Sequence, residues 1–374
     1  MNRRRGMWLA LAVVLLAVGA GLMFTGQGEE PEVEPPKVDF PRKMRPEERK
    51  RAELRRTQVL PARGPEDAGT AVATPQRPRD PVLAALPRGK GRSAVVIEAN
   101  ALRHSPIGEL LMDCMMRDGG KRMDEFRQVS GVDPFQDLDR MVITDDGFIL
   151  SGDFSKARFT ELLQERVSSD YGPGARVYEP GEVVIAQADG GTRRGRGDSA
   201  VGTWNNQLLV VGDTPSSVKD VLDRVEGRGS NEPPIISENS TYGEMYGVLS
   251  VEQIARMLPP EQAELAQRLK QVADNVELHL DARSDVAMVA ELRGSDAAAV
   301  TDLGKSLGAA LSVGRLKAQA DGNKDLAQLL DFARVQPDGS SFKLEMAVPL
   351  EVIQERLKWC RDERQATGAT ETRQ

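Results

Sequence analysis

An uncharged apolar run from Met7 to Phe24, directly after Arg3-Arg4-Arg5, limits this chain more than any other feature. Eighteen helical residues span about 27 Å, close to the thickness of a bilayer core. Arginines before the run and glutamates after it, from Glu29 onward, predict a cytoplasmic N-terminus and export of the rest. The sequence therefore predicts a single-pass protein of the bacterial inner membrane. Residues 1–6 form a cytoplasmic tip, residues 7–24 the transmembrane anchor, and the C-terminal ectodomain lies in the periplasm.

A cleaved signal peptide is the alternative interpretation of this segment. Val18 and Ala20 are small residues that suit cleavage after Ala20. The apolar run continues through Leu22-Met23-Phe24, which is longer than a signal peptide needs and favours an uncleaved anchor. No cysteine lies near the segment, which excludes a bacterial lipoprotein. Both interpretations place the bulk of the chain outside the cytoplasm.

Residues 25–92 are predicted to be a disordered linker between the anchor and the folded part. They hold 11 of the 22 prolines and few large apolar residues. Such a segment cannot bury enough surface to offset the entropy lost on ordering. We expect it to act as a long tether.

Charge divides the chain at the end of this linker. Residues 1–92 hold 18 Lys and Arg against 11 Asp and Glu, whereas residues 93–374 hold 32 against 46, a net charge of −14. An ectodomain this acidic repels phosphate backbones, and it has few aromatic residues for base stacking. Nucleic-acid binding is therefore excluded.

The pattern of apolar residues predicts an α+β fold with mostly antiparallel sheets. Met141-Val142-Ile143 and Phe148-Ile149-Leu150 flank Asp145-Asp146-Gly147, which is a hairpin signature. We expect helices from Pro106 (renewed after Gly119-Gly120), from Ser155 through Val167, and over 214–225, 261–272, 296 onward, 324–333 and from Pro349. We expect strands over 94–97, 175–178, 183–186, 200–204, 208–211, 246–249, 276–280, 286–292 and 342–348, and a mobile loop over 189–198.

One local pattern recurs three times: an apolar strand, a glycine, a small polar residue and a helix. The glycines are Gly152, Gly212 and Gly294. A glycine permits the turn, and Asp, Ser or Thr can cap the following helix. A phosphate site is the less favoured interpretation, because no phosphate-loop spacing accompanies the glycines. The recurrence predicts a duplicated strand–helix–hairpin–helix lobe, with lobes at 93–228 and 241–362, a linker at 229–240 and a disordered tail at 363–374.

No catalytic, cofactor-binding or metal-binding residue can be assigned from the sequence. His104 lies outside any motif, and His279 alternates with Leu278 and Leu280, which predicts the polar face of a strand. The acids Asp137, Asp139, Asp145 and Asp146 are interpreted as solvated turn residues. No cofactor is expected.

The chain has two cysteines, Cys114 and Cys360, both in expected helices. In an oxidising compartment they could pair, but sequence alone does not give their separation. Two buried free thiols are the interpretation that we favour slightly.

These observations predict a membrane-anchored envelope protein whose ectodomain binds a protein or an envelope ligand and is not an enzyme. One alternative is a hydrolase that uses carboxylates alone, on cell-wall or polysaccharide material, with two acids in a cleft. Another is a carrier of a lipid or apolar ligand, with a large apolar cavity. The expected partners are the inner membrane, through residues 7–24, and an unidentified envelope protein or ligand; the oligomeric state is open.

Overall fold

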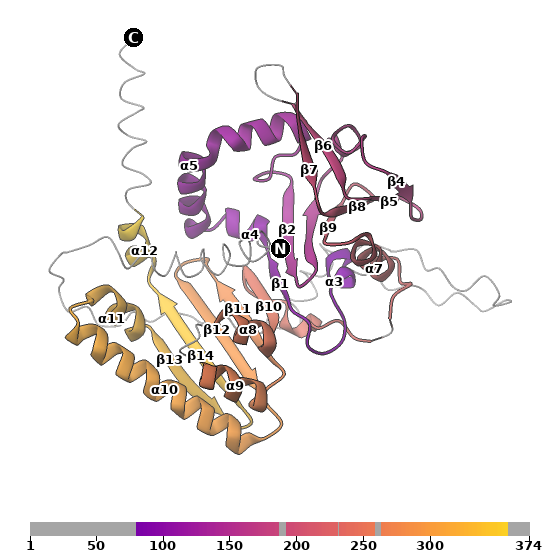
Figure 1. Cartoon of the computed structure of the whole chain (residues 1–374). Coiled ribbons are helices and arrows are strands. Elements are labelled where there is room, and N and C mark those ends of the chain that lie inside the picture. Colours follow the sequence, from indigo (N-terminus) through magenta and orange to yellow (C-terminus); the bar gives the residue numbers. More distant parts are fainter. Residues whose placement is uncertain (1–79, 187–191, 231, 259–262, 358–374) are drawn as a thin grey trace, which may run out of the picture. The chain divides into compact units, whose positions relative to one another are not determined.

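The computed structural model describes residues 80–186, 192–230, 232–258 and 263–357. The predicted tip, anchor, tail and most of the linker lie outside these residues. In the described part, helices accompany strands that pair antiparallel, which confirms the α+β class (Figure 1). None of the helices within these ranges has both the length and the apolar character needed to cross a bilayer.

The described residues divide into two compact units. The N-terminal unit contains residues 80–104 and 115–249, and the C-terminal unit contains residues 105–114 and 250–357. The long helix α5 (Pro106–Ser130) therefore contributes to both. The predicted lobe boundaries at 93–228 and 241–362 remain predictions.

The N-terminal unit is built on a sheet in which the strands follow the order β10-β1-β2-β3-β9-β8-β5-β4. Buried and half-buried residues alternate along β8 and β9, as expected for strands with one face on a core. The helix α7 buries Val218, Val221, Leu222 and Val225, the spacing of one helical face. The bounds are β1 (Ala94–Ile97), β2 (Leu138–Thr144), β3 (Gly147–Gly152), β4 (Ser168–Asp170), β5 (Ala175–Tyr178), β8 (Ala200–Trp204), β9 (Leu208–Gly212), β10 (Met245–Ser250), α4 (Ala99–Arg103) and α7 (Pro215–Val225).

The last part of the predicted linker is folded, which corrects the expectation that disorder extends to Arg92. The helix α3 (Pro81–Ala85) begins after Asp80, whose Oδ1 accepts a hydrogen bond from the Val82 backbone N at 2.9 Å. Val82, Ala85 and Leu86 are fully buried, and α3 packs beside α7 (Figure 1). This apolar burial and the Asp80 contacts offset the entropy lost when this segment orders.

The expected second linker, 229–240, packs against the same segment. The Ile235 backbone N donates to Pro87 O at 3.1 Å, and Arg88 Nη1 donates to Glu232 O at 2.8 Å. Ile236 is 2% exposed, and a short 3₁₀ helix spans Glu238–Ser240. Two segments with linker-like composition are thus ordered by contacts with each other.

The C-terminal unit has the strand order β11-β12-β14-β13, with its core between this sheet and the helices α9 and α10. Asp296 caps α10 by accepting hydrogen bonds from the backbone N of Ala298 and Ala299. The bounds are α8 (Val251–Met257), α9 (Ala263–Val272), β11 (Asn275–Asp281), β12 (Val286–Arg293), α10 (Ala297–Ala320), α11 (Lys324–Asp331), β13 (Ala333–Asp338), β14 (Ser341–Val348) and α12 (Leu350–Arg356).

Four expectations about local structure were wrong. The predicted loop at 189–198 contains β7 (Thr192–Gly197), which pairs with β6 (Gly181–Ala186). The helix α5 continues through Gly119-Gly120. The helix expected from Ser155 through Val167 shrinks to α6 (Phe159–Leu162), and Val167 is 75% exposed. The helix expected to reach Ala333 ends at Asp331, and the missed strand β13 follows.

The chain order of elements is similar from β1 and from β10. Each series begins with one strand, two helices and a hairpin (β2–β3 or β11–β12), and each ends with a second hairpin (β8–β9 or β13–β14) and a helix. Between the two hairpins the first series has α6 and the strands β4 to β7, whereas the second has α10 and α11.

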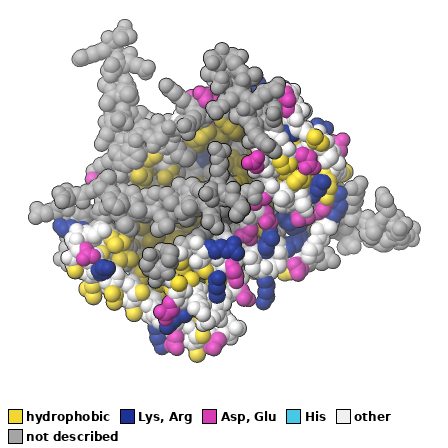
Figure 2. Space-filling model, in the orientation of Figure 1, with side chains coloured by type: hydrophobic (Ala, Val, Ile, Leu, Met, Phe, Trp, Pro, Cys, Tyr) yellow, Lys and Arg dark blue, Asp and Glu magenta, His cyan; other side chains and the backbone are white. Residues whose placement is uncertain are grey.

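Hydrophobic side chains gather over α10 and α11 in the space-filling view, at the lower left of Figure 2. Val313 and Leu316 on α10 are 64% and 61% exposed. The residues of α10 that contact the core are Val300, Leu303 and Leu307, which lie on another face. The outer surface of the helix is therefore apolar as well.

Candidate binding cleft

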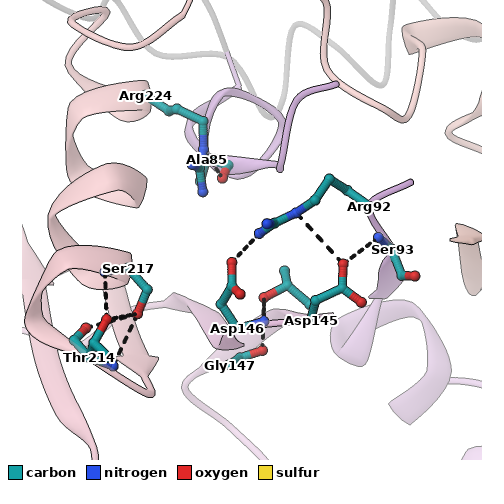
Figure 3. Close-up of polar contacts among 10 residues, drawn as sticks. Ala85, Arg92, Ser93, Asp145, Asp146, Gly147, Thr214, Ser217 and Arg224 are labelled. Atoms are coloured by element: carbon teal, nitrogen blue, oxygen red, sulfur yellow. Dashed lines mark hydrogen bonds and ion pairs between the residues drawn. The ribbon is translucent and has the colours of Figure 1, made fainter. Parts of the chain in front are cut away.

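A shallow, half-open cleft lies in the N-terminal unit between the β2–β3 hairpin, β9 and α7 (Figure 3). Its free volume is about 10 Å³, room for about one water molecule. It is lined by Pro87, Thr144, Asp146, Gly147, Phe148, Ile149, Val210, Val211, Gly212, Ser217, Val221 and Arg224.

The turn of the β2–β3 hairpin forms one side of the cleft and confirms the predicted hairpin. Thr144 Oγ1 donates to Gly147 O at 3.1 Å, and β2 pairs with β3 from Thr144 to Leu138. Gly147 has φ of 149°, and a Cβ there would lie 2.0 Å from Val211 O. Only glycine therefore allows β3 and β9 to approach as closely as they do.

The two acids of this turn are held by neighbouring groups. Asp145 Oδ2 accepts a hydrogen bond from the Ser93 backbone N at 2.7 Å and lies 3.7 Å from Arg92 Nε. Arg92 Nη2 forms an ion pair with Asp146. Both carboxylates thus serve to fasten the hairpin to the start of β1 (Figure 3).

The N-terminus of α7 forms the opposite side. Thr214 Oγ1 accepts a hydrogen bond from the Ser217 backbone N at 3.1 Å, and the Ser217 side chain returns a bond to the Thr214 backbone N. This capping box satisfies backbone donors at the helix start. The strand–glycine–helix pattern at Gly212 is therefore a helix cap, as the sequence indicated, and Asp296 confirms the same role after Gly294.

Arg224 and Arg88 are cations that lack a carboxylate partner among the described residues. Arg224 Nε donates to Ala85 O at 3.0 Å, and Arg88 Nη1 donates to the backbone carbonyls of Ser230 and Glu232. Burial lowers the pKa of Arg224, and the positive charges of Arg92 and Arg88 add to this shift, whereas Asp220 and Asp146 oppose it. Two charged side chains, Arg224 and Asp146, line the cleft, and of these Asp146 is paired with Arg92 while Arg224 has no carboxylate partner among the described residues.

Sequence reasoning missed these arginines. Ser217, Val221 and Arg224 recur at the spacing of one helix face, and this pattern could have indicated that Arg224 lies on the side of the helix that faces the sheet. The neighbouring acids Asp220 and Asp223 made this pattern hard to recognise, because a helix of mixed charge is normally a solvated surface.

The two histidines do not belong to the cleft. His104 follows α4, and its Nδ1 lies 2.7 Å from Asn100 O. His279 is 1% exposed, with its Nε2 3.0 Å from Glu277 Oε1. His279 shares a face of β11 with Glu277 and Asp281, which confirms the predicted polar face, and it is buried there.

The remaining candidate acids, Asp137 and Asp139, do not act together. Asp137 Oδ2 accepts a hydrogen bond from the Asp133 backbone N at 2.7 Å, and Asp139 is exposed on β2. In the ranges that the structure describes, no group of three His, Cys, Asp or Glu residues is placed to hold a metal ion.

Cys114 is disulfide-bonded, so the expectation of free thiols was wrong. The chain contains one other cysteine, Cys360, which lies outside the described residues. Disulfides persist chiefly in oxidising compartments.

The N-terminal and C-terminal units define this chain as an antiparallel α+β protein. No family model matches the sequence, and no curated protein matches it. One solved structure, "Structure of crystal form III of TP0453", is similar with a TM-score of 0.40 and 13% sequence identity, over 74% of this chain and 96% of that one. At these values the similarity supports no argument about fold or function.

Proposed function

We propose that this chain is a membrane-anchored protein of the bacterial envelope whose ectodomain binds a protein or an envelope ligand without catalysis. The observation that carries the proposal is the cleft beside α7, whose lining residue Arg224 lacks a carboxylate partner among the described residues, as does Arg88, which lies outside the lining. Partly buried cations without counter-ions cost stability, and a binding partner that supplies the missing charge gives a reason to retain them.

Export and anchoring are supported by two independent features. The apolar run at 7–24 follows three arginines, and the bonded state of Cys114 suits an oxidising compartment. The acidic ectodomain then lies on the far side of the membrane from its N-terminus.

We also propose that the ectodomain arose by duplication of a strand–helix–hairpin–helix lobe. The repeated chain order supports this, and β1 pairs antiparallel with β10, the strand that begins the second series, with Ala94 opposite Val248 and Ile97 opposite Met245. Equivalent strands that pair antiparallel are expected where two copies of one unit are related by a two-fold axis.

The alternatives receive less support from the cleft. A hydrolase that uses carboxylates alone needs two acids free to meet a substrate, whereas Asp145 and Asp146 are tied to Ser93 and Arg92. Trp204 is 2% exposed in the core and so is not a platform for sugars. A lipid carrier needs a cavity on the order of several hundred Å³, far more than this cleft holds.

Photo-crosslinking in cells tests the proposal directly. A photoreactive residue in place of exposed Asp220, next to Arg224 on α7, should give a discrete adduct in the full-length protein. The same residue in place of exposed Ser306 on α10 is the matched control and should give none. Excess unmodified chain should compete the adduct away. Equal crosslinking at both positions, or adducts that resist competition, would contradict a specific binding cleft.

A further inference from the structure

We infer that the cleft beside α7 accepts an anionic oxygen group of its ligand, a carboxylate or a phosphate, through an ion pair with Arg224. This inference rests on the proposed binding function and names the chemistry that the cleft recognises. Arginine pairs with either group through two parallel N–H···O bonds, which gives both strength and orientation.

The Arg224 guanidinium is held in place but is not saturated. Its Nε donates to Ala85 O at 3.0 Å, which fixes the plane of the group from α3 (Figure 3). Its two terminal nitrogens make no hydrogen bond to any of the described residues, and they are not among the buried nitrogens without a partner. They therefore keep some exposed surface, and Arg224 is one of the residues that line the cleft.

The charged side chains that line the cleft are Arg224 and Asp146. Asp146 is paired with Arg92, which also lies near Asp145, so Arg224 is the lining charge that has no ion pair among the described residues. Arg88 donates only to backbone carbonyls, and its Nε is buried with no partner. Asp220 lies near Arg224 without an ion pair within the described part, so it reduces the local positive charge but does not cancel it.

The size of the cleft limits what enters it. A free volume of about 10 Å³ admits one small group and not a whole ligand. The glycines Gly147 and Gly212 form part of its wall, and a Cβ on Gly212 would lie 2.6 Å from Ser217 Oγ. One oxygen of an anionic end group fits beside Arg224, while the rest of that group and of the ligand stays in the open mouth of the cleft.

The test measures binding of inorganic phosphate and of acetate to the full-length protein in detergent, by calorimetric titration at constant ionic strength with chloride as the balancing anion. Wild-type protein should bind at least one of the two anions saturably, and Arg224→Met should weaken that binding by at least about tenfold, as expected for loss of a bidentate ion pair. Phosphate binding alone would assign a phosphate ligand, and acetate binding alone a carboxylate ligand.

Arg315→Met is the matched control, because Arg315 on α10 is paired with Asp331 at 2.8 Å and lies in the other unit. This variant should bind as wild type does. Arg224→Met also loses the hydrogen bond to Ala85 O, so its thermal unfolding is measured beside its binding to show that it is folded at the temperature of the titration. If that variant fails to fold, Arg224→Lys replaces it in the test. This substitution keeps the positive charge but removes the paired guanidinium N–H donors, so the variant should bind the anion more weakly than wild type.

Two results would overturn the inference. One is that neither anion binds to wild-type protein; the other is that the Arg224 variants bind as wild type does. If either occurs while the competed crosslink at position 220 persists, the binding function stands and only the assigned ligand chemistry fails. Loss of the specific crosslink would instead remove the proposed function itself.

Discussion

Arg140→Ala should lower the free energy of unfolding by about 3–5 kcal/mol, because it leaves a buried carboxylate without its partner. Arg140 on β2 donates to both oxygens of Asp80, at 2.6 and 2.8 Å, and the two side chains are 8% and 6% exposed. Burial alone lowers the pKa of Arg140, but the charge and hydrogen bonds of Asp80 outweigh it and raise the pKa above its usual value. Chemical denaturation of the purified protein measures the effect.

Arg176→Ala is the control for this prediction. Arg176 pairs with Asp170 at 3.2 Å, but the side chains are 44% and 82% exposed, so the loss of stability should be much smaller than for Arg140→Ala. The double variant Asp80→Asn with Arg140→Met should recover part of the stability, since no buried charge is left unpaired. Equal effects at Arg140 and Arg176 would show that the Asp80–Arg140 pair does not secure the start of the folded region.

Cys114→Ser should cost about 2–5 kcal/mol of stability, the usual effect of removing a native disulfide. Cys114 is disulfide-bonded, and a disulfide restricts the unfolded chain, so its loss favours unfolding. Thermal unfolding in non-reducing buffer measures the change.

Reduction provides the internal control for Cys114. A reducing agent should lower the midpoint of wild-type protein toward that of Cys114→Ser and should leave the variant unchanged. Thiol counting under denaturing, non-reducing conditions should find no free thiol in the wild type. Two reactive thiols in protein taken from cells would contradict the bonded state and would also weaken the argument for export.

The parts of the fold that the sequence predicted well are those determined by near neighbours. The β2–β3 hairpin follows from Asp145-Asp146-Gly147 between two apolar runs. The start of α10 follows from Asp296, and the turn before α11 follows from Gly322 with φ of 73° and from Asn323, which caps that helix. In each case the atoms that make the structure lie within a few residues of one another.

The parts that were missed depend on distant contacts. Asp80 and Arg140 are far apart in sequence, so composition alone placed Asp80 in a disordered linker. The burial of His279 could not be predicted, because alternation shows which residues share a face but not what covers that face. The strand β13 contains Pro337 and follows a helix without a break, so periodicity extended the helix into it.

The same reason explains why the cleft could not be predicted. Arg224, Arg92 and Asp146 come from three separate elements, and the sequence contains no motif that joins them. The interpretation of each residue alone, as a solvated charge, was reasonable. The sheet order brings β3 beside β9, and α7 packs on β9. These contacts bring the charged residues together at one site.

Reporter fusions at the C-terminus of the full-length chain test the central claim most directly, since anchoring, disulfide formation and ligand binding all require export of the ectodomain. A fused alkaline phosphatase, which folds only in an oxidising compartment, should be active, and it should stay with the membrane fraction after a high-salt wash. Full phosphatase activity released in soluble form would show that the apolar run at 7–24 is not a stable anchor. An inactive phosphatase, together with a fluorescent cytoplasmic reporter at the same position, would contradict the account as a whole.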